Sequence, residues 1–370
     1  MKIVADKNIP FLKGIAEHFG TTEYLAGADF THDAILDADT LIVRTVTHFD
    51  EAMLEGTNVK LLCTATIGFD HIDTNYCDTH GIVWKNAPGC NSSSVQQYIV
   101  SALLVMAQNN GFNLKDKTIG IVGVGNVGKK VAKACKVLGM RVLLNDPPRE
   151  KEEGGESFVS LEKIKEEADI ITFHTPLTKE GEYKTYHLAD ADFFSSLNRR
   201  AIIINSARGA IVDTSAIKKA IGNRDIEGAI IDCWESEPNI DMEYMNMVDI
   251  ATPHIAGYSA DGKANATRMS LESVANFYGM DKTILSEVQP PQPTNPIIDL
   301  NSFDANRRIE SAILTTYNPT DDFDRLKNSP STFKDQRNNY PLRREYSAYT
   351  VLNANPEEKH ILNELGFICK

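Results

Sequence analysis

Short apolar runs alternate with helix-length segments along the first 260 residues. The runs are rich in Val, Ile and Leu and occupy residues 2–5, 40–43, 60–66, 118–123, 141–146, 169–175, 200–206, 228–232 and 249–254. Continuous apolar runs between helices are typical of parallel strands that are buried on both faces. The runs form two sets, separated by a long apolar helix predicted over residues 94–108. The pattern therefore predicts two doubly wound α/β domains.

The pattern changes after Val288. Four prolines within seven positions disfavour both a helix and a central strand, so the segment 290–296 is predicted to be a linker. A third unit follows, and its last helix is predicted to start at Pro356, capped by Asn355, and to stop near Gly366. The apolar side of this helix needs a partner surface and consists of Ile361, Leu362, Leu365 and Ile368.

Charge, apolar length and cysteine spacing exclude several classes of function. The chain has 370 residues and a formal net charge of −13, which argues against a nucleic-acid binder and a polybasic membrane-surface protein. The longest apolar stretch, residues 99–107, is about half the length of a membrane-spanning helix, and Asp6 interrupts the amino terminus before a signal peptide could form. The six cysteines are scattered without C-x-x-C pairs, and no His/Cys/Asp cluster has metal-ligand spacing. We therefore expect a cytoplasmic protein without a metal, a membrane contact or a nucleic-acid partner.

A glycine-rich loop provides the first functional motif. The loop Gly123-Val124-Gly125-Asn126-Val127-Gly128 lies between a predicted strand and a predicted helix, and the next strand ends at Asp146. Glycines at these positions let the backbone approach a pyrophosphate, while the acid can bind the adenosine ribose hydroxyls. Asp146 should repel a 2′-phosphate, so the motif predicts NAD in preference to NADP. The glycines, Asn126 and Val127 are the predicted pyrophosphate-binding residues.

Polar residues recur where the predicted strands end. They are Arg44, Thr45, residues 64–68, Asp146, Thr175, residues 206–209, Asp232 and His254. An open α/β sheet binds its ligands at the carboxyl ends of its strands, so these residues together predict one cleft between two domains. The alternative for Thr175, Ser206 and Asp232 is simple loop capping.

Four ordered segments resemble the signatures of the D-2-hydroxyacid dehydrogenases. They are Gly123–Gly128, Asn205–Gly209, Asp232–Pro238 and Thr252–Gly257, and the resemblance extends over about residues 1–285. It implies a flavodoxin-like substrate domain (1–95 with 259–288) and a Rossmann NAD domain (96–258). A small α+β carboxy-terminal dimerisation domain (289–370) would complete the chain.

The resemblance also implies a catalytic set of Arg208, Glu237 and His254. Oxidising a 2-hydroxy acid requires a base for the hydroxyl proton, and an imidazole titrates near neutral pH. Glu237 would hold one ring nitrogen of His254, and Arg208 would bind the substrate carboxylate with its two-pronged guanidinium. Glu235 competes for the acid role, but the family places its catalytic acid directly before a proline, which here is Pro238.

The remaining site predictions concern the cofactor and the substrate. The expected cofactor contacts beyond the glycine loop and Asp146 are Thr175, Ser206, Ala207, Arg208, Asp232 and Gly257. The expected substrate contacts are Arg44, Thr45, Thr66, Ile67, Gly68 and Tyr258.

Three features resemble one branch of the family, which acts on a phosphorylated four-carbon hydroxy acid in pyridoxal 5′-phosphate biosynthesis. They are the segment 257–263, the segment 44–47 and the carboxy-terminal unit of about 80 residues. The branch implies a homodimer. Arg343 or Arg344 would then reach the partner's cleft, or else form a solvated or interfacial salt-bridging pair. The alternatives are another 2-hydroxyacid dehydrogenase, such as one acting on glycerate 3-phosphate, and a non-catalytic NAD-sensing scaffold. The intact catalytic set disfavours the scaffold.

Overall fold

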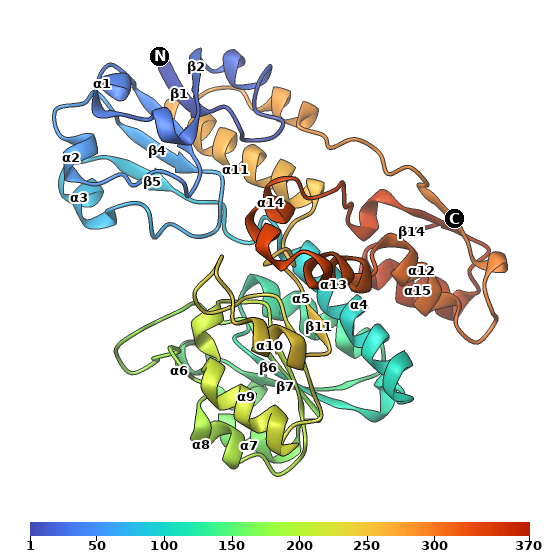
Figure 1. Ribbon diagram of the computed structural model, residues 1–370. Helices are drawn as coiled ribbons and strands as arrows, with labels where there is room; N and C mark the ends of the chain where they lie inside the picture. The colour runs from blue at the N-terminus through green and yellow to red at the C-terminus, as the bar shows by residue number, and fades with distance from the viewer. The chain divides into compact units, whose positions relative to one another are not determined.

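The computed structural model describes residues 1–370, apart from the side chain at position 156. Contacts group the chain into two compact units, residues 1–91 with 259–292 and residues 92–258 with 293–370. Both units are α/β and are drawn in Figure 1. The fold class predicted from the apolar pattern is confirmed, while the division into three domains stays a prediction.

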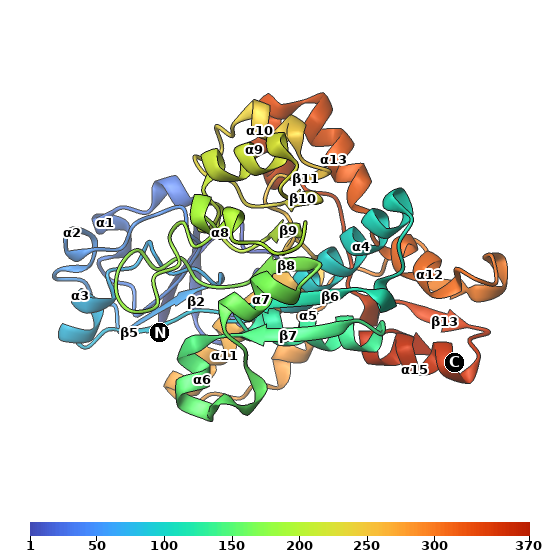
Figure 2. The same ribbon diagram turned by 90° about the horizontal axis from the view of Figure 1, so that it is seen from below.

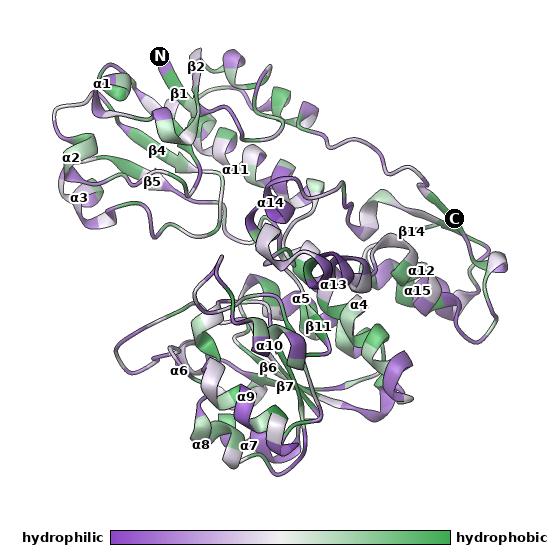
Figure 3. Ribbon diagram, viewed as in Figure 1, coloured by the Kyte–Doolittle hydropathy of each residue, from purple (hydrophilic) through white to green (hydrophobic). Residues whose placement is uncertain are grey.

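The first unit contains a five-stranded parallel sheet. Its strand order is β2-β1-β3-β4-β5, the flavodoxin-like order expected from the sequence. The strands are β1 (Lys2–Asp6), β2 (Thr21–Leu25), β3 (Thr40–Val43), β4 (Leu61–Thr64) and β5 (Val83–Lys85). The short helices α1 (His32–Ile35), α2 (Glu51–Leu54) and α3 (Thr74–Thr79) connect them, and α11 (Ala260–Tyr278) returns to pack on β4. Figure 3 shows the apolar character of the central strands.

The second unit is built on a six-stranded parallel sheet, visible in Figure 2. Its strands are β6 (Thr118–Val122), β7 (Arg141–Asn145), β8 (Ile170–Phe173), β9 (Ile202–Asn205), β10 (Gly228–Ile231) and β11 (Ile250–Ala251). Their order is β11-β10-β9-β8-β6-β7, so the chain reverses direction across the sheet at β6. A doubly wound sheet binds its ligand at this switch point. The helices are α4 (Ser92–Asn110), α5 (Asn126–Val137), α6 (Pro147–Glu153), α7 (Leu161–Glu167), α8 (Ala191–Ser195), α9 (Thr214–Asn223) and α10 (Met242–Met247).

The carboxy-terminal segment of the second unit has its own small sheet. The parallel strands β12 (Ile297–Asp299), β13 (Thr350–Leu352) and β14 (Ile368–Cys369) pair in this order. The helices are α12 (Arg308–Thr316), α13 (Pro319–Asn328), α14 (Phe333–Asn338) and α15 (Pro356–Leu365). Helix α15 begins with the predicted Asn355 cap, whose side chain accepts a hydrogen bond from the Glu358 backbone N–H, and ends at Gly366.

Two expectations about this segment need correction. Leu362 and Leu365 of α15 are buried in the same hydrophobic core as α4 and α5, and Ile361 packs against it, so the chain itself covers most of the stripe that we expected a second copy to cover. Ile368 lies in β14 instead of the helix and is 49% exposed. Arg343 and Arg344 retain only 4% and 6% exposure, which disfavours two of the alternatives left open for them, contact with a partner's cleft and a solvated pair. Arg343 instead donates hydrogen bonds to the carbonyl oxygens of Ile255 and Ala256 in its own chain.

The apolar pattern missed the strands β2 and β5. β2 (TTEYL) is a partly exposed edge strand, and β5 has only three residues, so neither carries a continuous apolar run. The prediction also overextended β11, which pairs only at Ile250 and Ala251 before the polar loop begins. In the described part of the chain, no helix is long and apolar enough to cross a membrane.

Candidate active site

The glycine loop lies at the switch point of the second sheet. Gly123 has a φ of +89°, and a Cβ there would come within 2.7 Å of the backbone at His174 and Thr175. A Cβ on Gly128 would come within 2.0 Å of the Gly123 carbonyl oxygen, which explains why helix and strand can pack so closely. A Cβ on Gly125 would meet open space. Helix α5 starts directly after Gly125, so its amino-terminal N–H groups face the position where a pyrophosphate binds in such folds.

Two buried hydroxyl groups beside this loop have no hydrogen-bond partner. They are Oγ1 of Thr175, after β8, and Oγ of Ser206, after β9. Buried polar atoms are nearly always hydrogen-bonded, so orphaned hydroxyls at the ligand-binding edge of the sheet fit a polar cofactor. Both residues were predicted to contact NAD, and the donor set therefore fits this group.

Asp146 lies at the end of β7. Its carboxylate accepts hydrogen bonds from the backbone N–H of Val124, at 2.7 Å, and of Arg149, at 3.2 Å. The acid thus sits directly against the glycine loop. The Arg149 guanidinium is engaged by Glu153, through two hydrogen bonds of 2.7 and 2.6 Å, and by the Val124 carbonyl. This arrangement suits an adenosine ribose with a free 2′-hydroxyl.

The loop that carries Arg208 is folded back on itself by Asn205. The Asn205 side chain donates to the Arg208 carbonyl at 2.9 Å and accepts from the Ala207 N–H at 3.2 Å. A Cβ on Gly209 would come within 2.0 Å of the Trp234 backbone, so only glycine allows the two loops to lie together. The Arg208 guanidinium donates from Nη1 to the Ala207 carbonyl at 2.8 Å.

Asp232 organises the loop that carries His254. One carboxylate oxygen accepts from the Thr252 hydroxyl at 2.6 Å and the Ile255 N–H at 2.7 Å, and the other accepts from the Ala256 N–H at 3.0 Å. Burial raises the pKa of Asp232 despite the opposing effects of His254 and these hydrogen bonds. Asp232, which we expected near the cofactor, is thus held by hydrogen bonds from the loop that carries His254. Gly257 follows in the turn that the Tyr258 N–H closes on the Ile255 carbonyl.

Glu237 and His254 form a close pair. Nδ1 of His254 lies 2.7 Å from one Glu237 carboxylate oxygen, and the other oxygen accepts from the Trp234 N–H at 2.8 Å. Burial tends to raise the pKa of Glu237, but the contacts with His254, the Trp234 N–H and Arg337 outweigh it and hold the pKa below its ordinary value. The imidazole is about 29% exposed, so its Nε2 side is available to a substrate.

Glu235 has a different partner. Its carboxylate lies 2.8 Å from Nε2 of His187 and accepts from the Thr214 N–H at 2.9 Å. The geometry thus pairs His254 with the acid that precedes Pro238, and it pairs Glu235 with a histidine on another loop.

The Cys233 thiol also lies near the pair. Single ligand atoms of Cys233, Glu237 and His254 all lie within 4.8 Å of one another, a spacing that could suit a metal ion. However, Nδ1 of His254 and one Glu237 oxygen lie at hydrogen-bond distance from each other, 2.7 Å, and the second Glu237 oxygen accepts from the Trp234 N–H. We therefore interpret the group as a hydrogen-bonded acid and base.

The predicted substrate residues of the first unit follow β3 and β4. The Arg44 guanidinium forms two hydrogen bonds, of 2.9 and 3.3 Å, to the buried carboxylate of Asp6. The Thr66 hydroxyl bonds to the Gly68 carbonyl at 3.0 Å, and the Ile67 carbonyl accepts from Asn86 at 2.8 Å. Thr45 is exposed. The contact of these residues with a substrate stays a prediction. Two of the Arg44 guanidinium nitrogens are engaged by Asp6, so fewer of its donors than we expected remain for a substrate.

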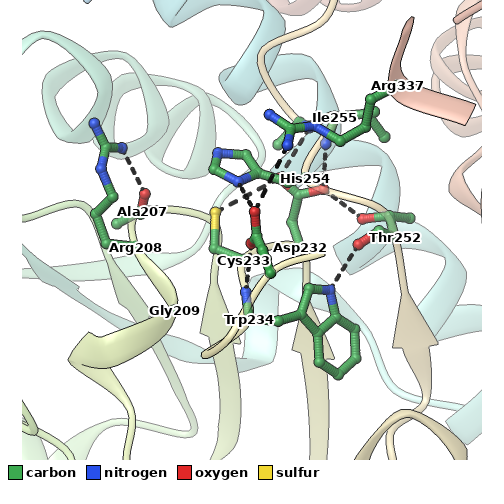
Figure 4. A network of polar contacts seen from close by, with 12 residues as sticks. Ala207, Arg208, Gly209, Asp232, Cys233, Trp234, Thr252, His254, Ile255 and Arg337 are labelled. Carbon is green, nitrogen blue, oxygen red and sulfur yellow. Dashed lines mark hydrogen bonds and ion pairs between the residues drawn. The ribbon is translucent and has the colours of Figure 1, made fainter. Parts of the chain in front are cut away.

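One residue of the site had escaped the sequence analysis. Arg337, on α14, lies 3.8 Å from the Glu237 carboxylate and donates to the Tyr258 hydroxyl at 3.1 Å. Figure 4 shows its guanidinium beside the His254 ring. Arg337 belongs to no motif and is separated from Tyr258 by 79 positions, so only the fold reveals it.

Comparisons with known proteins identify the family. Residues 93–256 match the family model described as the NAD-binding domain of D-isomer specific 2-hydroxyacid dehydrogenases. Residues 290–366 match a domain of unknown function. The erythronate-4-phosphate dehydrogenase of Bacteroides thetaiotaomicron is 54% identical over 95% of this chain and 99% of its own length. The protein of the same name from Porphyromonas gingivalis is 47% identical over the full length of both chains.

The chain belongs to the erythronate-4-phosphate dehydrogenase family. Within the D-2-hydroxyacid dehydrogenases, a solved NAD⁺-bound 3-phosphoglycerate dehydrogenase of Entamoeba histolytica is 27% identical. It covers 75% of this chain and 95% of its own length with a TM-score of 0.61. The family assignment confirms the resemblance found in the sequence. The chain is therefore an NAD-dependent oxidoreductase acting on a CH–OH group, and NAD is its cofactor.

Proposed function

We propose that this chain oxidises 4-phospho-D-erythronate to 3-hydroxy-2-oxo-4-phosphooxybutanoate with NAD, as a step in pyridoxal 5′-phosphate biosynthesis. The observation that carries the proposal is the 2.7 Å contact between Glu237 and His254 in a chain whose full-length relatives bear the name erythronate-4-phosphate dehydrogenase. An intact acid and base have no role in an NAD-sensing scaffold, so we do not favour that alternative.

The chemistry follows from the positions of three side chains. Nε2 of the partly exposed His254 accepts the proton of the C2 hydroxyl, while Glu237 holds Nδ1 and stabilises the imidazolium that forms. Arg208 binds the C1 carboxylate with guanidinium donors that the Ala207 carbonyl leaves free. When bound, NAD supplies the acceptor for the C2 hydride.

Cofactor contacts are proposed for the glycine loop (Gly123, Gly125, Asn126, Val127 and Gly128), Asp146, Thr175, residues 206–208, Asp232 and Gly257. Substrate contacts are proposed for Arg44, Thr45, Thr66, Ile67, Gly68 and Tyr258. The unpartnered hydroxyls of Thr175 and Ser206 support the cofactor set most directly.

A substrate panel tests the proposal. The purified chain and its His254→Ala variant are assayed with NAD and 4-phosphoerythronate, erythronate, glycerate 3-phosphate and lactate. We expect the wild type to prefer 4-phosphoerythronate, and the variant to lose about 10²–10⁴-fold in turnover while NADH still binds. A preference for glycerate 3-phosphate or lactate would favour the alternative 2-hydroxyacid dehydrogenases. Retention of more than about a tenth of the turnover would remove His254 from the mechanism.

We also propose a cytoplasmic homodimer, formed by the carboxy-terminal sheet. Ile297 of β12 and Ile368 of β14 align with Thr350 of β13 in the strand register, so all three share one face of the sheet. The two isoleucines are 61% and 49% exposed. This face replaces the α15 stripe as the surface that a second copy would cover.

A further inference from the structure

Arg337 has donors that no described contact uses. Its side chain is about 29% exposed. Nη2 donates to the Tyr258 hydroxyl, but Nη1 lies 3.8 Å from Glu237, beyond hydrogen-bond length, and the buried Nε has no partner. The guanidinium also lies over the Tyr258 ring, 5.6 Å from its centroid. These contacts orient the group and leave hydrogen-bonding capacity for a ligand.

Other arginines considered for the far end of the substrate are occupied. Arg44 gives two hydrogen bonds to Asp6. Arg343 is buried, and its guanidinium donates to the backbone carbonyls of Ser94, Ile255 and Ala256. Arg343 therefore holds the loop behind His254 and is remote from solvent.

The order of charged groups in the site matches the order of groups in the proposed substrate. In the view of Figure 4, Arg208 and Arg337 lie on opposite sides of the His254 ring. The substrate carries a carboxylate on C1, the reacting hydroxyl on C2 and a phosphate on C4. If Arg208 binds the carboxylate and His254 the hydroxyl, the phosphate points away from Arg208, toward the second guanidinium.

We propose that Arg337 of the carboxy-terminal segment is the specificity residue that binds the substrate phosphate in its own chain. The inference rests on the proposed function. It gives the segment 290–366, which matches a domain of unknown function, a direct part in substrate recognition. Helix α14 is anchored by the buried Phe333, so it can hold the guanidinium in place.

Arg337→Met and Arg337→Lys test the assignment, with Arg307→Met as a matched control. Arg307 is on the same segment, is about half exposed and contacts Glu310 only at the surface. Steady-state rates are measured with 4-phosphoerythronate and with erythronate, which lacks the phosphate. NADH binding and thermal unfolding report whether each variant folds.

We expect Arg337→Met to raise the KM for 4-phosphoerythronate about 10- to 150-fold, the range for a lost hydrogen bond to a charged group, and to change kcat much less. The kcat/KM for erythronate should fall at least about tenfold less than that for 4-phosphoerythronate, since only the phosphorylated acid loses a direct contact. Arg337→Lys should recover part of the affinity because it restores the charge. Arg307→Met should match the wild type.

An equal loss with both acids would overturn the assignment, because Arg337 would then act through Glu237 or Tyr258. An unchanged KM in Arg337→Met would also overturn it. If Arg337→Met does not fold, Arg337→Lys decides: equal effects on the two acids reject the phosphate contact. A wild type without preference for the phosphorylated acid would overturn the proposed function itself, a result distinct from these.

Discussion

Glu237 and Glu235 offer a matched pair of perturbations. They are two positions apart, yet the first contacts His254 at 2.7 Å and the second contacts His187 at 2.8 Å. Glu237→Gln preserves the side-chain volume but removes the negative charge. Its amide N–H₂ must then face either the His254 ring or the Trp234 N–H, because the carboxylate accepts from both sides.

The expected loss follows from that one contact. A hydrogen bond to a charged group contributes about 1.5–3 kcal/mol, and about 1.4 kcal/mol corresponds to a tenfold change in rate. We therefore expect Glu237→Gln to lower kcat/KM for the hydroxy acid by about 10- to 150-fold. Glu235→Gln should change it by less than about threefold, because Glu235 touches neither His254 nor Glu237.

NADH absorbance measures the rates, and NADH titration checks that the cofactor still binds. If Glu237→Gln stayed within about threefold of the wild type, or if Glu235→Gln proved the more damaging change, the assignment of the acid would be refuted.

The same substitution predicts a pH dependence of stability. The folded-state pKa of Glu237 lies below its ordinary value of 4.5, so ionised Glu237 stabilises the folded chain above about pH 4.5. This contribution is lost as the pH falls from 4.5 through the lower folded-state pKa. The difference in free energy of unfolding between wild type and Glu237→Gln should therefore be larger at pH 7 than at pH 4. Denaturant titrations at the two pH values measure it, and a larger difference at pH 4 would contradict the reasoning.

Three further predictions concern the cofactor, the carboxylate and the dimer. Asp146→Ser should weaken NAD binding and reduce the preference for NAD over NADP in cofactor titrations, whereas unchanged NAD affinity would place the adenosine ribose elsewhere. Arg208→Lys keeps the charge but loses the two-pronged geometry, so steady-state kinetics should show a higher KM for the hydroxy acid and lower turnover. An effect on NAD affinity alone would make Arg208 a cofactor residue. Replacing Ile297 and Ile368 together by Glu should give a monomer in sedimentation velocity, because the glutamates of one copy would repel those of the other across the exposed sheet face. A dimer that persists would place the interface elsewhere.

The sequence alone determined the fold class and much of the chemistry. Continuous Val, Ile and Leu runs appear only where both faces of a strand are buried, so the central strands were predictable and the polar edge strand β2 was not. The glycine loop and Asp146 lie in short segments whose local spacing carries the signal, and the Glu237–His254 pair was implied by the resemblance of its two segments to family signatures. The cap at Asn355 is equally local, and the structure places α15 directly after it.

Only the tertiary structure decided which side chains meet across long sequence separations. Asp232 accepts from a loop more than 20 positions away, and Arg337 reaches Tyr258 across 79 positions. Neither contact has a periodicity or spacing that a linear pattern could reveal. The packing of α15 also depended on the tertiary structure. An amphipathic stripe indicates that its apolar side is covered, but it does not identify the surface that covers it. Here the surface belongs to α4 and α5 of the same chain, since this is where the carboxy-terminal segment packs.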